Sequence, residues 1–281
     1  MFLPLNNFAV KKMKIYDNHT HSHFSPDSRM NLEQSIAQAA KLGIAGISIT
    51  DHLDIDAPGN KDFFYFSPIE QHEAIDRLSA QYPNLEILKG IEVGLQDCCM
   101  DKIKEFTSQY NFDVVIASQH FIDGTDPYYG EYYIGKNAEQ AYSRAYEVMY
   151  KNIVEYSDFD ILGHYDYIAR YAPYLNERDI KYAKYSDILD PILKFLVHGG
   201  KALEVNTNTY RERNGYTPML DIEILKRFKE LGGEAVSLGS DAHEPWRITE
   251  NFEKYYKILE ECGFKYIVHF KERKPIYDKI K

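Results

Sequence analysis

Histidine and carboxylate side chains recur along this chain in short clusters of the kind that binds divalent metal ions. The first cluster reads Asp17-Asn18-His19-Thr20-His21. Because alternate residues of an extended segment point the same way, its two imidazoles can hold one ion. Further clusters contain the following residues: Asp27, His52, Glu92, His120, His164, Asp241 and His243. Imidazole and carboxylate donors without thiolates suit Zn, Fe or Mn, and the chemistry that we expect of them is metal-dependent hydrolysis.

Short segments rich in β-forming residues stand just before most of these clusters. They cover residues 14–17, 46–50, 85–88, 112–117, 159–162, 201–205 and 234–238, with a weaker one at 265–270. Amphipathic stretches of helical length lie between them, among them residues 32–42, 138–156 and 222–231. This alternation predicts an α/β fold with a parallel sheet, either a closed barrel of seven strands or a doubly wound open sheet. Since the carboxyl ends of parallel strands lie on one face, we expect the metal-binding side chains to converge there.

The composition disfavours several classes of protein. The chain has 281 residues, 44% of them hydrophobic and 27% charged, which is enough for one sizeable core and lacks the bias of a disordered or repetitive protein. A formal net charge of −10 opposes binding to nucleic acid or to anionic membranes, whose phosphates attract clustered Lys and Arg. No apolar segment approaches the length of a membrane span. We therefore expect a small-molecule substrate, no nucleic-acid partner and no membrane.

The N-terminus and the cysteines bear on domain organisation and location. Because the first β-rich segment follows Met13, we expect residues 1–12 to be an N-terminal extension and residues 13–281 to be a single domain. The three cysteines, two of them adjacent at Cys98 and Cys99, form neither a disulfide framework nor a Cys-x-x-Cys pair. This usage is typical of a reducing compartment, so we expect a cytoplasmic protein.

The clusters and their order along the chain resemble the polymerase-and-histidinol-phosphatase (PHP) superfamily of metallohydrolases, from residue 13 onward. The resemblance implies a distorted seven-stranded β/α barrel with a site for three divalent ions at the carboxyl ends of its strands. It implies nine ligands: His19, His21, Asp27, His52, Glu92, His120, His164, Asp241 and His243. One ion would lie among His19, His21, Glu92 and Asp241, a second among Glu92, His120 and His164, and a third among Asp27, His52 and His243.

Three shorter stretches, residues 163–171, 203–207 and 240–243, are similar to the histidinol-phosphatase branch of this superfamily. That similarity implies hydrolysis of L-histidinol phosphate to L-histidinol and phosphate, a step of histidine biosynthesis. A hydroxide that bridges two metal ions would attack the phosphorus. Glu92, Asp241 and His243 would be the catalytic residues, with Glu92 bridging two ions and either Asp241 or His243 protonating the leaving alkoxide.

Two arginines are candidates for binding the phosphate of the substrate. A guanidinium group can pair bidentately with two phosphoryl oxygens, and we assign this role to Arg170 and Arg211, with Arg213 as the alternative to Arg211. Barrel enzymes usually carry specificity in the loops after their strands, so residues 54–66 are the expected place for contacts to the alcohol. Three other functions stay open: another small phosphate ester such as a nucleotide or sugar phosphate, an exonuclease activity, and a non-catalytic binding role.

Overall fold

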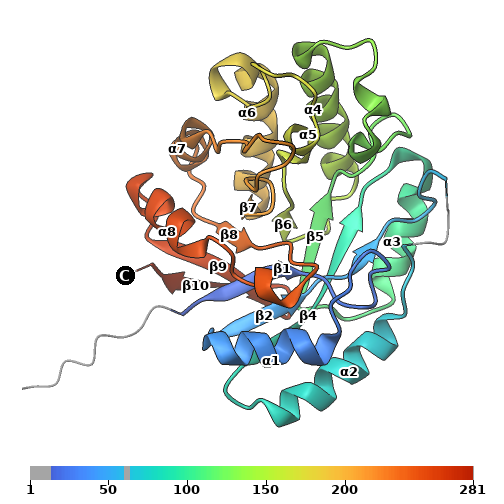
Figure 1. Cartoon of the computed structure of the whole chain (residues 1–281), viewed down its shortest axis with the longest axis vertical. Coiled ribbons are helices and arrows are strands. Elements are labelled where there is room, and N and C mark those ends of the chain that lie inside the picture. The colour runs from blue at the N-terminus through green and yellow to red at the C-terminus, as the bar shows by residue number, and fades with distance from the viewer. Residues whose placement is uncertain (1–13, 60–63, 281) are drawn as a thin grey trace, which may run out of the picture.

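A parallel sheet that curls into a nearly closed barrel forms the centre of the computed structural model, which describes residues 14–59 and 64–280 (Figure 1). Its strands follow the order β1-β2-β4-β5-β6-β7-β8. Their bounds are β1 (Tyr16–Thr20), β2 (Gly46–Ile49), β4 (Glu86–Gly94), β5 (Val114–Ser118), β6 (Ile161–Leu162), β7 (Ala202–Asn206) and β8 (Val236–Gly239). A short β3 (His52–Leu53) pairs with the second half of β4. Every neighbouring pair in this sheet is parallel.

The barrel closes where the chain segments that follow β8 meet the end of β1. The amide of Asp241 donates to the carbonyl of His19 at 2.8 Å, and the amide of His21 donates to the carbonyl of Ala242 at 2.9 Å. The pairing of β1 with β2 is irregular between Asp17 and Thr20, so the barrel is distorted on that side of β1 as well. The predicted seven-stranded α/β barrel is therefore confirmed, and the open doubly wound sheet was the wrong alternative.

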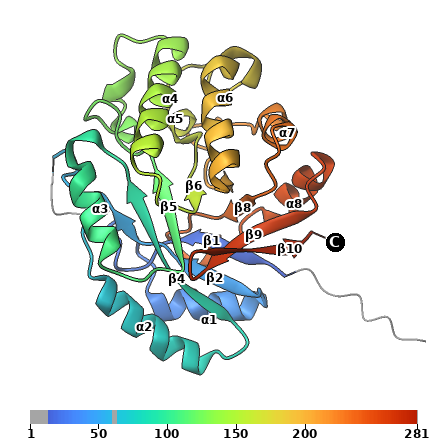
Figure 2. The same ribbon diagram turned by 180° about the vertical axis from the view of Figure 1, so that it is seen from behind.

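Helices alternate with the strands and cover the outside of the barrel (Figure 2). They are α1 (Leu32–Leu42), α2 (Pro68–Gln81), α3 (Met100–Ser108), α4 (Ala138–Glu155), α5 (Tyr167–Arg170), α6 (Tyr182–Gly199), α7 (Ile222–Glu230) and α8 (Phe252–Glu261). Short 3-10 turns are η1 (Asp97–Cys99), η2 (Pro127–Tyr129), η3 (Glu131–Tyr133) and η4 (Pro245–Arg247).

The ends of the helices follow from local chemistry. The Asn31 side chain accepts a hydrogen bond from the amide of Glu33 at the start of α1, and Gly43 ends that helix with a φ of 66°. This left-handed conformation costs glycine little, which is why the helix ends there. Asn137 and Gln140 form a capping box at the start of α4.

The weaker β-rich segment at 265–270 does not join the barrel. It forms β9 (Tyr266–Lys271), which pairs antiparallel with β10 (Lys274–Lys279) in a separate two-stranded sheet. Glu272 and Arg273 connect them with φ angles of 49° and 61°, the left-handed pair that a two-residue type I′ turn requires. The Asn18 side chain donates to the carbonyls of both Leu238 and Val268 at 3.3 Å, so the hairpin lies against the β1–β8 seam.

Buried apolar side chains from the strands and from the inner faces of the helices pack around the barrel in three clusters, of which the largest joins β4, β5, β7 and β8 to α3, α4, α6 and α7. The predicted extension at residues 1–12 lies outside the described residues, and the division into one domain at residues 13–281 stays a prediction. Among the helices that the structure describes, none is long and apolar enough to cross a membrane.

Candidate metal centre

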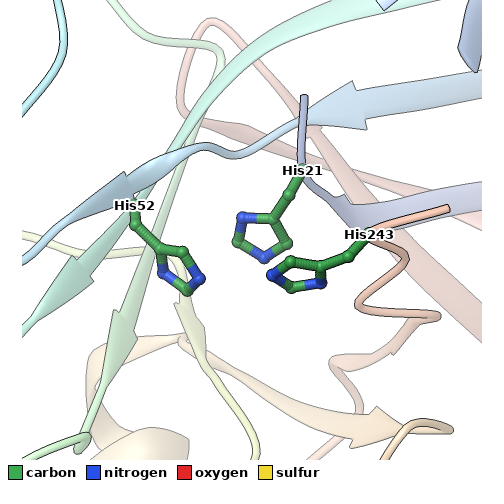
Figure 3. Close-up of side chains that lie close together, drawn as sticks. All are labelled: His21, His52 and His243. Atoms are coloured by element: carbon green, nitrogen blue, oxygen red, sulfur yellow. The ribbon is translucent and has the colours of Figure 1, made fainter. Parts of the chain in front are cut away.

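The carboxyl ends of the strands bring the predicted metal-binding side chains to one face of the barrel. Four groups of three have ligand atoms within 4.8 Å of one another: His21, His52 and His243; His19, His164 and Asp241; His19, His21 and Glu92; and His52, Glu92 and His120. Figure 3 shows the imidazoles of His21, His52 and His243 close together although they come from the segment after β1, from β3 and from the segment after β8. His21 therefore approaches His52 and His243 as well as the predicted partners His19 and Glu92, and the assignment of ligands to individual ions stays a prediction.

Glu92 lies at the centre of this arrangement and is fully buried. Its Oε2 atom is 2.8 Å from His52 Nδ1 and 3.3 Å from His19 Nε2. Its Oε1 atom is 2.7 Å from His164 Nε2 and 3.3 Å from His120 Nε2. Burial alone would raise the pKa of Glu92, but the surrounding imidazoles, His19 and His120 first, outweigh it and hold the pKa well below its usual value. One carboxylate thus faces both halves of the histidine cluster, as a bridging ligand must.

Two buried carboxylates outside the cluster orient the histidines that face it. Glu204 Oε1 lies 2.8 Å from Nδ1 of His19, and Asp54 Oδ1 lies 2.9 Å from Nδ1 of His120. Each contact engages the outer ring nitrogen and leaves Nε2 to face Glu92. A carboxylate behind a ligating histidine fixes its tautomer and raises its basicity, so both pairs are arranged as in a metal site.

A serine and an aspartate perform the same positioning for His21. The Ser25 hydroxyl lies 3.2 Å from Nδ1 of His21 and donates to Asp51 Oδ1 at 2.7 Å. The amide of His52 donates to the same Ser25 oxygen at 3.0 Å, and Asp51 also accepts from Gln71 Nε2 at 2.7 Å. Asp51 therefore anchors the loop after β1 and the start of β3 together.

The buried polar atoms of the cluster suit divalent metal ions. Five buried side-chain atoms of the predicted ligands make no well-oriented hydrogen bond to the described residues, although His52 Nδ1 and Glu92 Oε2 lie 2.8 Å apart: His19 Nε2, His21 Nε2, His52 Nδ1, Glu92 Oε2 and His164 Nδ1. Buried polar atoms normally find a partner, and unmet ones at a functional site indicate an ion or ligand. The donor set and its buried, unmet atoms therefore fit divalent metal ions.

Asp27 and His243 form the outer edge of the cluster. Asp27 Oδ2 lies 3.3 Å from His243 Nε2 and 3.5 Å from His52 Nε2. The Asp27 side chain is 41% exposed and that of His243 is 23% exposed, whereas Glu92 and His19 are fully buried. This third group of predicted ligands therefore lies nearest to solvent, at the mouth of the site.

Above the cluster the structure forms an open cavity of about 980 Å³, and all three candidate arginines line it. Arg170 is buried, donates from Nη1 to Asp241 Oδ2 at 2.9 Å and from Nε to the Thr209 hydroxyl at 2.9 Å. Its Nη2 atom is buried and has no hydrogen-bond partner among the described residues. Arg170 thus holds one guanidinium nitrogen free beside the metal cluster.

Arg211 and Arg213 are more fully engaged than Arg170. Arg211 makes an ion pair with Glu250 at 2.5 Å and donates to Asn208 Oδ1 and to the carbonyl of Ser240. Arg213 donates twice to Asn208, and burial followed by the charge of Arg170 lowers its pKa to about 10. Both guanidinium groups still present positive charge to the cavity, and their role in phosphate binding stays a prediction.

Glu204, Asp54 and Asp51 support the predicted ligands through hydrogen bonds, and sequence reasoning missed this role. A signal was present for Glu204, because it is the one charged residue within the apolar segment 202–205, in a strand whose side chains are all buried. Asp51 and Asp54 lie on either side of His52 in sequence, but only the folded chain shows that Asp54 contacts His120 at 2.9 Å more closely than it contacts His52 at 3.9 Å.

Comparison with known proteins places this architecture in a family. The model of the PHP domain matches residues 17–208. A probable histidinol-phosphatase of Clostridium acetobutylicum is 32% identical over 254 residues, covering 89% of this chain and 95% of the relative. A histidinol-phosphatase of Lactococcus lactis is 34% identical over 261 residues, covering 92% of this chain and 95% of that protein.

A solved structure agrees in fold as well as in sequence. The histidinol phosphate phosphatase of Lactococcus lactis, complexed with zinc, L-histidinol and phosphate, has a TM-score of 0.85 and 31% sequence identity, covering 94% of this chain and 99% of that chain. The putative histidinol phosphatase hisK of Listeria monocytogenes shares the fold at 19% identity and a TM-score of 0.65. Since the family model matches more than half of the chain and the relatives align over nearly all of it, the chain belongs to the PHP domain family.

Proposed function

We propose that this chain is a divalent-metal-dependent phosphomonoesterase that hydrolyses L-histidinol phosphate to L-histidinol and phosphate. The observation that carries the proposal is the cluster of buried imidazoles around Glu92, with the free nitrogen of Arg170 beside it on the cavity wall. The names of the relatives, and the zinc, L-histidinol and phosphate in the Lactococcus lactis complex, support the same reaction. A cytoplasmic location belongs to the proposal, because a biosynthetic step is the role that those names imply.

Nine residues are proposed to hold three divalent ions, with Zn, Fe or Mn as the metals that suit their donors. They are His19, His21, Asp27, His52, Glu92, His120, His164, Asp241 and His243. Divalent ions bound there would supply positive charge to the phosphoryl oxygens and lower the pKa of water toward about 7.

The arginines of the cavity would bind and orient the phosphoryl group. Arg170 is held at Nε by Thr209 and at Nη1 by Asp241, so its Nη2 atom has a defined direction and can donate to a phosphoryl oxygen. Donors fixed in advance stabilise developing charge without the cost of reorganisation. Arg211 adds a second positive charge to the same cavity.

A proton must reach the alkoxide as the ester bond breaks. Asp241 and His243 stand on the segment after β8, next to the cluster, and both line the cavity. We propose that one of these two residues donates the proton. The donor is identified by measuring the rate as a function of pH for wild type, Asp241→Asn and His243→Asn. The decrease in rate at high pH should be absent in the variant that lacks the proton donor.

The test is phosphate release from L-histidinol phosphate by the metal-loaded protein, beside a panel of nucleotide and sugar phosphates. We expect a strong preference for L-histidinol phosphate, with loss of turnover when a chelator removes the metal and recovery when Zn²⁺ or Mn²⁺ is restored. A preference for another ester would contradict the substrate and keep the chemistry. Hydrolysis that survives chelation would contradict the metal-dependent mechanism itself.

A further inference from the structure

The cavity above the metal cluster has two chemically different parts, and Tyr167 connects them. The guanidinium carbon of Arg170 lies 5.2 Å from the centre of the Tyr167 ring. The hydroxyl of the same ring donates to Asp126 Oδ1 at 3.0 Å. The ring therefore separates the arginines, which suit a phosphoryl group, from a carboxylate that faces the same cavity.

Asp126 is a carboxylate without a cationic partner. Its Oδ1 atom accepts from the amide of Tyr128 at 2.8 Å and from the hydroxyl of Tyr167. Its Oδ2 atom makes no hydrogen bond to any residue that the structure describes, and no Lys, Arg or His of those residues forms an ion pair with it. Partial burial raises the pKa of Asp126, and this effect outweighs the opposing effects of its hydrogen bonds and of the nearby His120.

The other carboxylates that line the cavity already have partners or are well exposed. Asp54 holds His120, Glu250 pairs with Arg211, and Glu244 lies 3.5 Å from Arg247. Asp27 and Asp241 belong to the proposed metal centre, and Glu212 is exposed. Among the described carboxylates that line the cavity, Asp126 is therefore the one that is half-buried, has no ion-pair partner and can bind a ligand.

Aromatic rings surround Asp126 on the same part of the wall. The rings of Tyr128 and Tyr171 have centroids 5.1 Å apart, and those of Tyr167 and Tyr171 are 5.5 Å apart. The Tyr167 ring also lies 5.6 Å from that of His120, so this aromatic wall begins beside the metal cluster. Ring faces next to a carboxylate attract an organic cation, both through their negative faces and through the charge of the carboxylate.

We propose that Asp126, held by Tyr167 and by the amide of Tyr128, binds the protonated amine of the alcohol and so selects phosphate esters of amino alcohols. The inference rests on the proposed function, because L-histidinol phosphate carries such an amine near its ester. The amine rather than the imidazole is assigned to Asp126, since an aliphatic amine is fully protonated at neutral pH whereas a free imidazole, with a pKa of about 6.5, is mostly neutral. Specificity then resides in the loop after β5 rather than in the segment 54–66 that follows β3.

The test compares Asp126→Asn with wild type on two esters that differ in the amine: L-histidinol phosphate and its deaminated analogue 3-(imidazol-4-yl)propyl phosphate. Asparagine keeps the acceptor for the Tyr128 amide and removes the charge. We expect kcat/KM for L-histidinol phosphate to fall about 10- to 100-fold, mainly through KM, as for loss of one partner of a partly exposed charge pair. For the deaminated ester we expect a change of less than about twofold, since it makes no contact with the missing charge.

Two further variants and one binding measurement sharpen the result. Glu212→Gln removes an exposed negative charge from the same cavity and serves as the matched control, with kcat/KM for L-histidinol phosphate expected to stay near that of wild type. Tyr167→Phe keeps the ring and removes the hydroxyl that holds Asp126, so it is expected to give a smaller loss on the same ester. L-histidinol is expected to inhibit Asp126→Asn more weakly than wild type, whereas inorganic phosphate inhibits both equally.

Each outcome separates this inference from the proposed function. Wild-type protein that fails to hydrolyse L-histidinol phosphate contradicts the proposed function, whatever the variant does. Wild-type protein that is active, beside an Asp126→Asn variant that loses both esters equally or loses neither, contradicts the role of Asp126 alone. An equal loss in Glu212→Gln would mean that the net charge of the cavity, rather than a contact at Asp126, selects the substrate.

Discussion

The Glu204→Gln substitution tests whether a carboxylate behind the cluster determines how tightly the metal binds. Glu204 is 1% exposed and receives three contacts: His19 Nδ1 at 2.8 Å, the amide of His164 at 2.6 Å and Asn206 Nδ2 at 3.1 Å. Glutamine has nearly the same shape, but one of its two terminal atoms is a donor. Since all three groups donate to Glu204 when His19 carries its proton on Nδ1, at least one contact must be lost.

The size of the effect follows from the kind of contact removed. A buried hydrogen bond to a charged group contributes about 1.5–3 kcal/mol, and each 1.4 kcal/mol changes an equilibrium constant about tenfold. We therefore expect the variant to bind Zn²⁺ about 10- to 100-fold more weakly, which is also the usual range for partners behind a ligating histidine. The measurement is titration of the apoprotein with Zn²⁺ in competition with a chromogenic chelator.

A buried carboxylate at the opposite end of the strands provides the control. Asp160 stands just before β6 and accepts from the amide of Val115 at 2.8 Å and from Arg273 Nε at 2.5 Å. Asp160→Asn is expected to lower the melting temperature and to leave the affinity for Zn²⁺ unchanged. Equal affinity in wild type and in a folded Glu204→Gln protein would refute the reasoning, as would an equal loss of affinity in both variants.

Three further predictions concern the strand packing, the phosphate and the pH. Gly94→Ala would place a Cβ atom 1.6 Å from Asp54 Oδ1 and 3.1 Å from His120 Nδ1. We therefore expect most of the turnover to be lost while circular dichroism shows the secondary structure retained. A fully active variant would contradict this close packing around Gly94. Arg170→Lys keeps the charge and loses the planar fork, so we expect kcat/KM for L-histidinol phosphate to fall about 10- to 100-fold and inorganic phosphate to inhibit more weakly; unchanged inhibition by phosphate would rule out its assigned role. Burial, and then Lys89, lowers the pKa of His72 below the value of about 6.5 that the unfolded chain has. As the pH falls from 7.5 to 5.5, the imidazole of His72 is protonated in the unfolded chain before it is protonated in the folded protein. The free energy of unfolding of the wild type should therefore decrease relative to that of His72→Gln, measured by urea unfolding at both pH values. A difference between the two proteins that does not change with pH would contradict the shift.

Regular elements could be predicted from the sequence where hydrophobic period and end signals agree. Residues 32–42 were predicted to be helical and form α1 to the residue, because the apolar face is followed directly by Gly43. The strand predicted at 85–88 extends instead to Gly94. Gly90 and Gly94 lie within this strand, and a Cβ at Gly90 would lie 2.6 Å from Thr50 Cγ2. Glycine is there to let neighbouring chains approach closely, which sequence alone does not distinguish from a turn.

The convergence of the predicted metal ligands could be foreseen because strand ends meet on one face, whereas the residues that support these ligands could not. His19 and Glu204 are 185 residues apart, and nothing in either local sequence relates them. The hairpin of β9 and β10 was missed for a similar reason, since Glu272 and Arg273 are unusual in a type I′ turn. Contacts of their backbone amides with Asp113 hold them there.

The seam between β1 and β8 also determines the order in which the molecule can be assembled. Asn18 and Leu238, which meet across that seam, are 220 residues apart, so the barrel cannot close until nearly the whole chain has left the ribosome. Until then His19 and His21 lack Asp241 and His243, and the nascent chain has only part of the metal centre. Pairing of such distant segments is slow, and an ion that binds only the closed form would favour closure by mass action. Metal supply during biosynthesis would then govern the yield of folded protein as well as its activity, and a chain that ended before β8 would have neither a closed barrel nor a complete site.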